Sequence, residues 1–178
     1  LWYTPLLPGM FYVSTIMAGL SLGILAYKAA CTLRGAAEDR RIASGLGTGL
    51  FWVSLVYAAL KLGELTWAGE WPLLLDGHYG LLWSVEIGAG VLLPLLLLSR
   101  RAWRGNPKVQ IAAPLLVLAG VLMNRFNATL YGQVLPVGSS TYTPHILEWI
   151  STVGILAAAL MAWIICVRWV VRDEEHHA

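Results

Sequence analysis

Five ionisable side chains interrupt otherwise apolar stretches of this sequence, and they are the residues with most potential for chemistry. They are Lys61, Glu64, Glu86, Arg125 and Glu148. An Arg, Lys or Asp at the centre of a membrane helix costs roughly 2.5–3.5 kcal/mol, so such groups pair with one another or line a wet cavity. A partly buried carboxylate near a cation can exchange protons. These residue types indicate a polar pocket that handles protons.

The composition places this pocket in a membrane protein. Of the 178 residues, 58% are hydrophobic and only 12% are charged, whereas a soluble domain has about 25% charged residues. The two cysteines, Cys31 and Cys166, lie within apolar runs. The composition excludes a soluble domain, a disordered chain, a nucleic-acid-binding module and a disulfide framework.

Five apolar windows are long enough for helices that cross a bilayer, which need roughly 20 residues each. They cover residues 6–30, 42–66, 80–99, 111–131 and 146–171. The predicted fold class is an all-α membrane protein, a bundle of five transmembrane helices in one domain over residues 1–178. The first residue is Leu rather than Met, and five crossings fit the second half of a ten-helix protein.

The basic residues predict the orientation of the helices. Ten of the twelve fall at one side of the predicted bundle, which the positive-inside rule makes cytoplasmic, together with the C-terminus. These ten are Lys28, Arg34, Arg40, Arg41, Arg100, Arg101, Arg104, Lys108, Arg168 and Arg172. The two exceptions, Lys61 and Arg125, lie inside predicted helices, so they are the cations to examine for function.

The direction of each helix places the five intramembrane charges at one depth, near the outer boundary. Lys61 and Glu64 are three residues apart and can pair within their helix, which leaves Arg125 to bridge Glu86 or Glu148. The inner half of the bundle is expected to hold nothing comparable. The alternative is a purely structural role, in which charged side chains near helix ends extend to the membrane–water interface. This alternative fits Lys61, Glu64 and Glu148. It fits the deeper Arg125 and Glu86 less well.

Haem and metal sites are not expected in this chain. Axial haem ligands would be His pairs deep on facing helices, but the histidines lie in loops, at helix edges or in the tail. They are His78, His145, His176 and His177. The sequence also lacks the cysteine and histidine spacings of a metal site.

Five segments together resemble the polysulfide reductase/NrfD-like membrane subunits, most nearly the HybB-type hydrogenase subunit. The segments are LWYTPLLPGMFYVSTIMAG, KLGELTW, WSVEIGAGVLLPLLLL, NRFNATLYG and YTPHILEWISTVGI. The family pattern falls on Trp2, Pro5, Pro8, Lys61, Glu64, Glu86, Pro94, Arg125, Asn127, Tyr142, Pro144 and Glu148. The resemblance extends over nearly all of the chain.

This resemblance implies a haem-free, quinone-reactive integral subunit in a bacterial or archaeal cytoplasmic membrane. It implies menaquinone or ubiquinone as the bound substrate. It also implies two partners on the outer face, a ferredoxin-like iron–sulfur subunit and an exported catalytic subunit, possibly that of a [NiFe] hydrogenase.

The resemblance also suggests roles for individual residues. Glu86 or Glu148 handles protons, and Arg125 holds the carboxylates. His145 or Tyr142 contacts the quinone head group or the iron–sulfur partner. The remaining residues assigned to the quinone pocket are Lys61, Glu64 and Asn127.

Two other functions fit part of the pattern. A proton-coupled transporter or ion-translocating subunit would also use buried acids and bases on helices kinked at Pro94 and Pro114. A passive membrane anchor for an outer-face enzyme would not need Arg125 or Glu86 at depth.

Overall fold

The computed structural model describes residues 6–75, 77–130 and 145–175, and in this part of the chain all regular structure is helical. Five helices are long and apolar enough to cross a membrane, which confirms the predicted all-α membrane fold. The chain divides into two units, Leu1–Gly138 and Ser139–Ala178, and each is described by itself.

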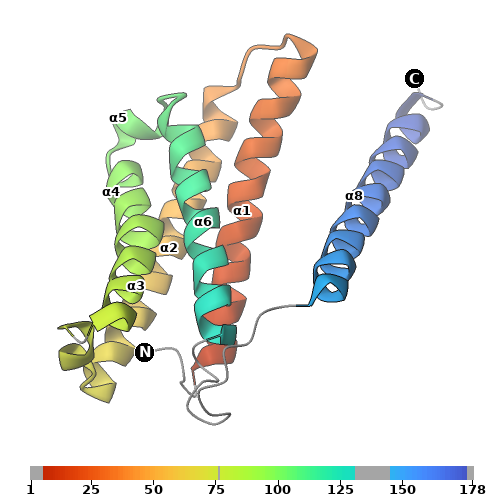
Figure 1. Ribbon diagram of the computed structural model, residues 1–178. Coiled ribbons are helices and arrows are strands. Elements are labelled where there is room, and N and C mark those ends of the chain that lie inside the picture. The colour runs from red at the N-terminus through yellow and green to blue at the C-terminus, as the bar shows by residue number, and fades with distance from the viewer. Residues whose placement is uncertain (1–5, 76, 131–144, 176–178) are drawn as a thin grey trace. The chain divides into compact units, whose positions relative to one another are not determined.

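The first unit is a bundle with four membrane crossings (Figure 1). Helix α1 packs against α2 and α6, and α4 also packs against α2 and α6, so the crossings surround a shared core. The elements are α1 (Leu7–Arg34), α2 (Arg40–Ala68), a 3₁₀ turn η1 (Trp71–Leu75), α3 (Gly77–Ile87), a π-helical segment η2 (Gly88–Leu92), α4 (Leu93–Ser99), the short α5 (Arg101–Arg104) and α6 (Val109–Leu130).

Helix ends explain why the first two crossings are longer than the predicted windows. Helix α1 continues to Gly35, which has a left-handed φ of 62° that glycine adopts without a steric penalty. The Asp39 side chain then accepts a hydrogen bond from the Arg41 amide at 2.7 Å and caps the start of α2. These caps lie in polar sequence, so the hydropathy windows stop before them.

The third crossing is interrupted halfway along its length. It runs as α3, widens into the π segment Gly88–Leu92, and resumes as α4 with Pro94 in its first turn. Proline has no amide hydrogen and crowds the preceding turn, and a π segment accommodates such a break. At this point a Cβ built on Gly90 would lie 2.5 Å from the Cα of Gly120 in α6, so the two backbones are in contact.

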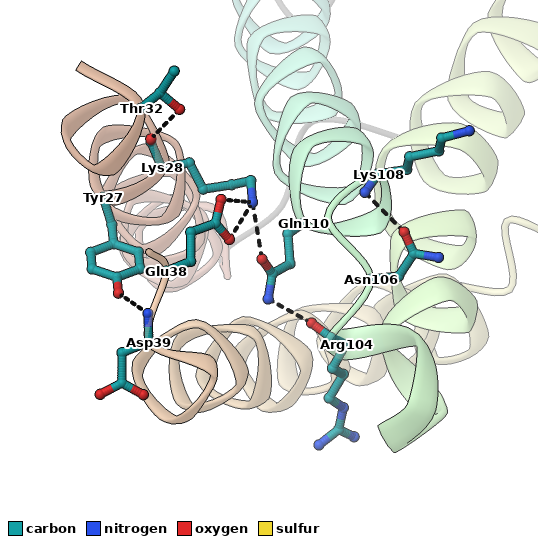
Figure 2. A network of polar contacts seen from close by, with 9 residues as sticks. All are labelled: Tyr27, Lys28, Thr32, Glu38, Asp39, Arg104, Asn106, Lys108 and Gln110. Carbon is teal, nitrogen blue, oxygen red and sulfur yellow. Dashed lines mark hydrogen bonds and ion pairs between the residues drawn. The ribbon is translucent and has the colours of Figure 1, made fainter. Parts of the chain in front are cut away.

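The basic end of the bundle is the end where α1 finishes and α2 begins, and it carries a buried polar network (Figure 2). Lys28 Nζ donates to both carboxylate oxygens of Glu38 at 2.7 Å and to Gln110 Oε1 at 3.2 Å. Gln110 Nε2 donates to the Arg104 carbonyl at 2.8 Å. The network therefore ties α1, the loop before α2, α5 and α6 together.

Arg104 is also buried, although the sequence places it in a cytoplasmic loop. It is 8% exposed, its Nη1 donates to Thr48 Oγ1 at 3.0 Å, and its guanidinium lies 4.8 Å from the centre of the Phe51 ring. The expectation that the inner half holds no polar cluster was therefore wrong. The number of cations at each end of the helices predicts the orientation of the bundle in the membrane, but it does not predict which of these side chains are buried.

Replacing Lys28 with Met should lower the free energy of unfolding of the detergent-solubilised protein by about 2 kcal/mol. The substitution leaves the Glu38 carboxylate without its cation and Gln110 Oε1 without its donor, and the partial exposure of Glu38 reduces the loss. Thermal unfolding measures the effect. A Lys28→Met/Glu38→Met double variant should regain part of the lost free energy of unfolding. A double variant that is less stable than Lys28→Met would contradict this account.

The second unit contains one long helix, α8 (Ile146–Glu175), with Glu148 in its first turn. The Nδ1 atom of His145 accepts a hydrogen bond from the Leu147 amide at 3.3 Å, at the start of the helix. The helix extends four residues beyond the predicted window.

Candidate functional site

The best-defined polar group inside the bundle is the carboxylate of Glu86, in the last turn of α3. Glu86 is 1% exposed. Asn124 Nδ2 donates to its Oε1 at 2.7 Å, and Asn127 Nδ2 donates to its Oε2 at 2.8 Å. Both asparagines belong to α6 and are themselves buried. A carboxylate oxygen has two acceptor positions, so each oxygen can accept more than one hydrogen bond.

The local fold explains this arrangement. Asn124 and Asn127 are three residues apart, so they share one face of α6 and both reach the same carboxylate. The contact between Gly90 and Gly120 lies one turn further into the bundle on both helices, and it holds α3 and α6 close enough for these short side chains to meet. The sequence singles out Glu86 and Asn127, but it does not identify Asn124 as a partner.

Lys61 reaches the interior from α2 at the same end of the bundle. It is 2% exposed, and no hydrogen bond or ion pair joins it to any residue that the structure describes. The predicted pair with Glu64 was therefore wrong. Three residues turn a helix by about 300°, so the two side chains differ by about 60° in direction, and Lys61 faces the core while Glu64 is only half-buried.

Tyr57, one turn before Lys61, adds a hydroxyl to this region. It is 3% exposed, and the charges of both Glu86 and Arg125 act on its hydroxyl group. Tyr57 is not among the residues that the sequence singles out. Its spacing of four residues from Lys61 is the signal that would have placed both on one face.

Arg125 has a different role from the one expected. Its Nη2 donates to the Phe11 carbonyl at 3.0 Å and to Ser14 Oγ and Thr15 Oγ1 at 3.2 Å each. Its guanidinium lies 3.6 Å from the centre of the Phe11 ring. The predicted bridge from Arg125 to Glu86 was wrong, because Arg125 projects toward α1 while its neighbour Asn124 occupies the carboxylate.

The structure does not place the remaining predicted site residues relative to this cluster. Glu148 and His145 belong to the second unit, and Tyr142 lies outside the described residues. His78, expected at a loop edge, lies in the first turn of α3. Within the described ranges no three His, Cys, Asp or Glu side chains gather in a way that could hold a metal ion.

The structure therefore brings together a buried carboxylate and the two amides that fix it, and it places a buried cation, Lys61, toward the same end of the bundle. A carboxylate can give or take a proton, and an ammonium group without a protein partner can donate to a carbonyl oxygen. This combination suits a ligand that has carbonyl groups and exchanges protons.

Comparison with known proteins adds the family. The family described as "Polysulphide reductase, NrfD" matches residues 1–137. A protein of Nitratidesulfovibrio vulgaris, designated only "Protein", is 30% identical over 157 residues, which take in 83% of this chain and 40% of that relative. The chain thus spans less than half the length of the curated relative that it matches. No solved structure matches it. Since the match to the family takes in all four crossings of the first unit, the chain belongs to the polysulphide reductase NrfD family of integral membrane proteins.

Proposed function

We propose that this chain forms the quinone-reactive part of a membrane subunit in a respiratory oxidoreductase complex. The observation that carries the proposal is the buried Glu86 carboxylate, oriented by two asparagines and accompanied by a buried Lys61 that has no partner among the described residues. Membership of the NrfD family supports it.

The chemistry of a quinone matches these groups. Reduction of a quinone to a quinol takes up two electrons and two protons, and oxidation returns them. In the proposal Lys61 donates a hydrogen bond to one carbonyl of the head group, and Glu86 exchanges protons at the site. Asn124 and Asn127 hold the Glu86 carboxylate in place. The electrons pass to or from a partner subunit.

The wider assembly is part of the same proposal. The partners are a ferredoxin-like iron–sulfur subunit and an exported catalytic subunit on the outer face, possibly that of a [NiFe] hydrogenase, as in a HybB-type complex. The quinone is menaquinone or ubiquinone. The basic end of the bundle faces the cytoplasm. Glu64 and Glu148, with Tyr142 and His145, complete the proposed pocket.

Replacing Lys61 with Met is the experiment that tests the proposal. Removing a buried charge that has no carboxylate partner should leave stability unchanged or raise it. If Lys61 binds the quinone, however, quinone-linked turnover of the intact complex should fall by a factor of about 10–100, the effect of losing a charged hydrogen bond of roughly 1.5–3 kcal/mol. The loss should appear mainly in KM for quinone.

Two measurements make this test specific. Thermal unfolding of the Lys61→Met complex, compared with Lys28→Met, separates a binding role from a structural one, because of the two lysines only Lys28 has an ion-pair and an amide partner among the described residues. Reduction of a soluble dye by the catalytic subunit checks that the rest of the complex works. Wild-type turnover and KM for quinone in Lys61→Met would overturn the proposed role.

A further inference from the structure

Small and polar residues recur every seven positions along the buried faces of α1 and α2. On α1 they are Ser14, Ser21 and Lys28, and on α2 they are Gly47, Ser54 and Lys61. We name these six residues the polar seam. Seven residues are about two helical turns, so each set lies along one side of its helix. The seam connects the region of Glu86 with the network at the basic end.

The seam contains two buried hydroxyl groups that have no hydrogen-bond partner among the described residues. Ser21 Oγ and Ser54 Oγ are the buried side-chain atoms that lack one in the described part of the chain, and both residues are 0% exposed. Ser14, in contrast, donates to the Phe11 carbonyl at 3.0 Å. A buried polar atom without a partner costs about 1–3 kcal/mol, and in proteins such atoms are normally satisfied by an ordered water.

The register of α1 against α2 sets how far apart these hydroxyls are. Leu20 lies against Gly49, where a built Cβ would be 3.8 Å from a Leu20 methyl. At ~1.5 Å per residue in antiparallel helices, Ser54 lies about 9 Å from Ser21 along the bundle, in the direction of Tyr57. Ser21 lies about 10 Å from Lys28. A gap of this length could be bridged by about two or three waters.

At one position of the seam the packing leaves room for an added methyl group. A Cβ built on Gly47 meets only a methyl group of Leu98, at 3.9 Å, although Gly47 is buried on α2. Both ends of the seam carry titratable groups. Lys28 is paired with Glu38 at the basic end. Toward the other end the charge of Glu86 acts on Tyr57, which lies one turn from Lys61.

We propose that the polar seam is hydrated and conducts protons between the basic end of the bundle and Glu86. The proton role rests on the proposed function, because the two protons that accompany each two-electron quinone conversion must travel to or from the buried carboxylate. The electrons use the iron–sulfur partner. The hydration of the seam does not depend on that function.

Silver ions test the hydration directly, because they are small and reach a thiol only through water. Ser21→Cys and Ser54→Cys are made separately in the full-length protein with Cys31 and Cys166 changed to Ser. Membranes are exposed to silver, and thiols left unreacted are alkylated after denaturation. Both seam thiols should be protected at least tenfold faster than Val117→Cys, a fully buried control on α6. Equal rates for all three would overturn the proposal.

A second measurement tests the proton role. In Ser54→Val two methyl groups take the place of the hydroxyl, so quinone-linked turnover should fall about tenfold. Ser54→Thr keeps a hydroxyl, and its turnover should match that of the wild type. Dye reduction by the partner should be unchanged. Full turnover in Ser54→Val, together with its loss in Lys61→Met, would refute the proton role of the seam and leave the proposed function intact. Protection of both thiols with full turnover in Ser54→Val would refute the proton role alone.

Discussion

Replacing Glu86 with glutamine should lower quinone-linked turnover of the intact complex by a factor of about 10²–10⁴, the range associated with loss of a general acid or base. Glutamine has the same shape but cannot ionise or exchange a proton at this position. The complex should still assemble. A rotated amide of Asn124 or Asn127 can present its oxygen to the new NH₂ group, so the pair of hydrogen bonds is retained.

The control for this prediction is the same chemical change at an exposed site. Asp39→Asn also converts a carboxylate to an amide, but Asp39 is exposed and caps α2, a position where asparagine serves equally well. Its turnover should match that of the wild type. Subunit composition and dye reduction are measured for both variants. If an assembled Glu86→Gln complex kept more than half of its quinone-linked turnover, Glu86 would not be the proton-handling group.

The membrane crossings were predictable from sequence because their signal is local. A run of about 20 apolar residues has few alternatives to a membrane helix, and all five windows correspond to helices. Counting residues along helices of alternating direction likewise predicts that Glu86 and Lys61 lie toward the same end of the bundle. Both residues lie toward the same end of the bundle in the structure.

The partners of these residues could not be predicted in the same way. Rotation about a helix axis is set by packing against other helices, so depth alone does not distinguish Arg125 from Asn124 as the neighbour of Glu86. In the structure Asn124 takes the carboxylate and Arg125 joins α6 to α1. The burial of Lys28 has a similar cause, because its partner Gln110 lies in another helix, 82 residues away.

The interruption of the third crossing is an intermediate case. Gly88, Gly90 and Pro94 signal an irregular helix, but they do not give the position of the π segment or the helix it touches. That contact depends on Gly120, thirty residues later in the chain. The role of Gly90 and Gly120 becomes clear only when the two helices that carry them are seen in contact.

Substituting Gly120 with Ala should destabilise the bundle and also impair the site. The new Cβ would lie 2.5 Å from the Cα of Gly90 and 3.1 Å from its carbonyl carbon. Both obstructing atoms are backbone, so no side chain can rotate away, and the helices must move apart. Overpacking of this kind typically costs 1–3 kcal/mol, so we expect a loss of about 3 kcal/mol in the free energy of unfolding.

The same movement should affect Glu86. Asn124 follows Gly120 by one turn of α6, and Glu86 precedes Gly90 by about one turn, so separation at the glycine pair draws the amide away from the carboxylate. Quinone-linked turnover should therefore fall about tenfold even at temperatures where the complex remains folded, as for loss of one charge-assisted hydrogen bond. Turnover per assembled complex and thermal unfolding in detergent measure the two effects separately.

Gly88→Ala is the matched control, because Gly88 lies in the same π segment and a Cβ built there meets nothing within 4 Å. Its unfolding and turnover should stay close to those of the wild type. If Gly120→Ala were as stable as Gly88→Ala, the contact between the two backbones would not hold the third crossing against α6. If Gly120→Ala were unstable but fully active per assembled complex, that contact would support the fold without positioning Glu86. Loss of both stability and turnover in Gly120→Ala alone would tie the orientation of the carboxylate to the closest approach of the two helices.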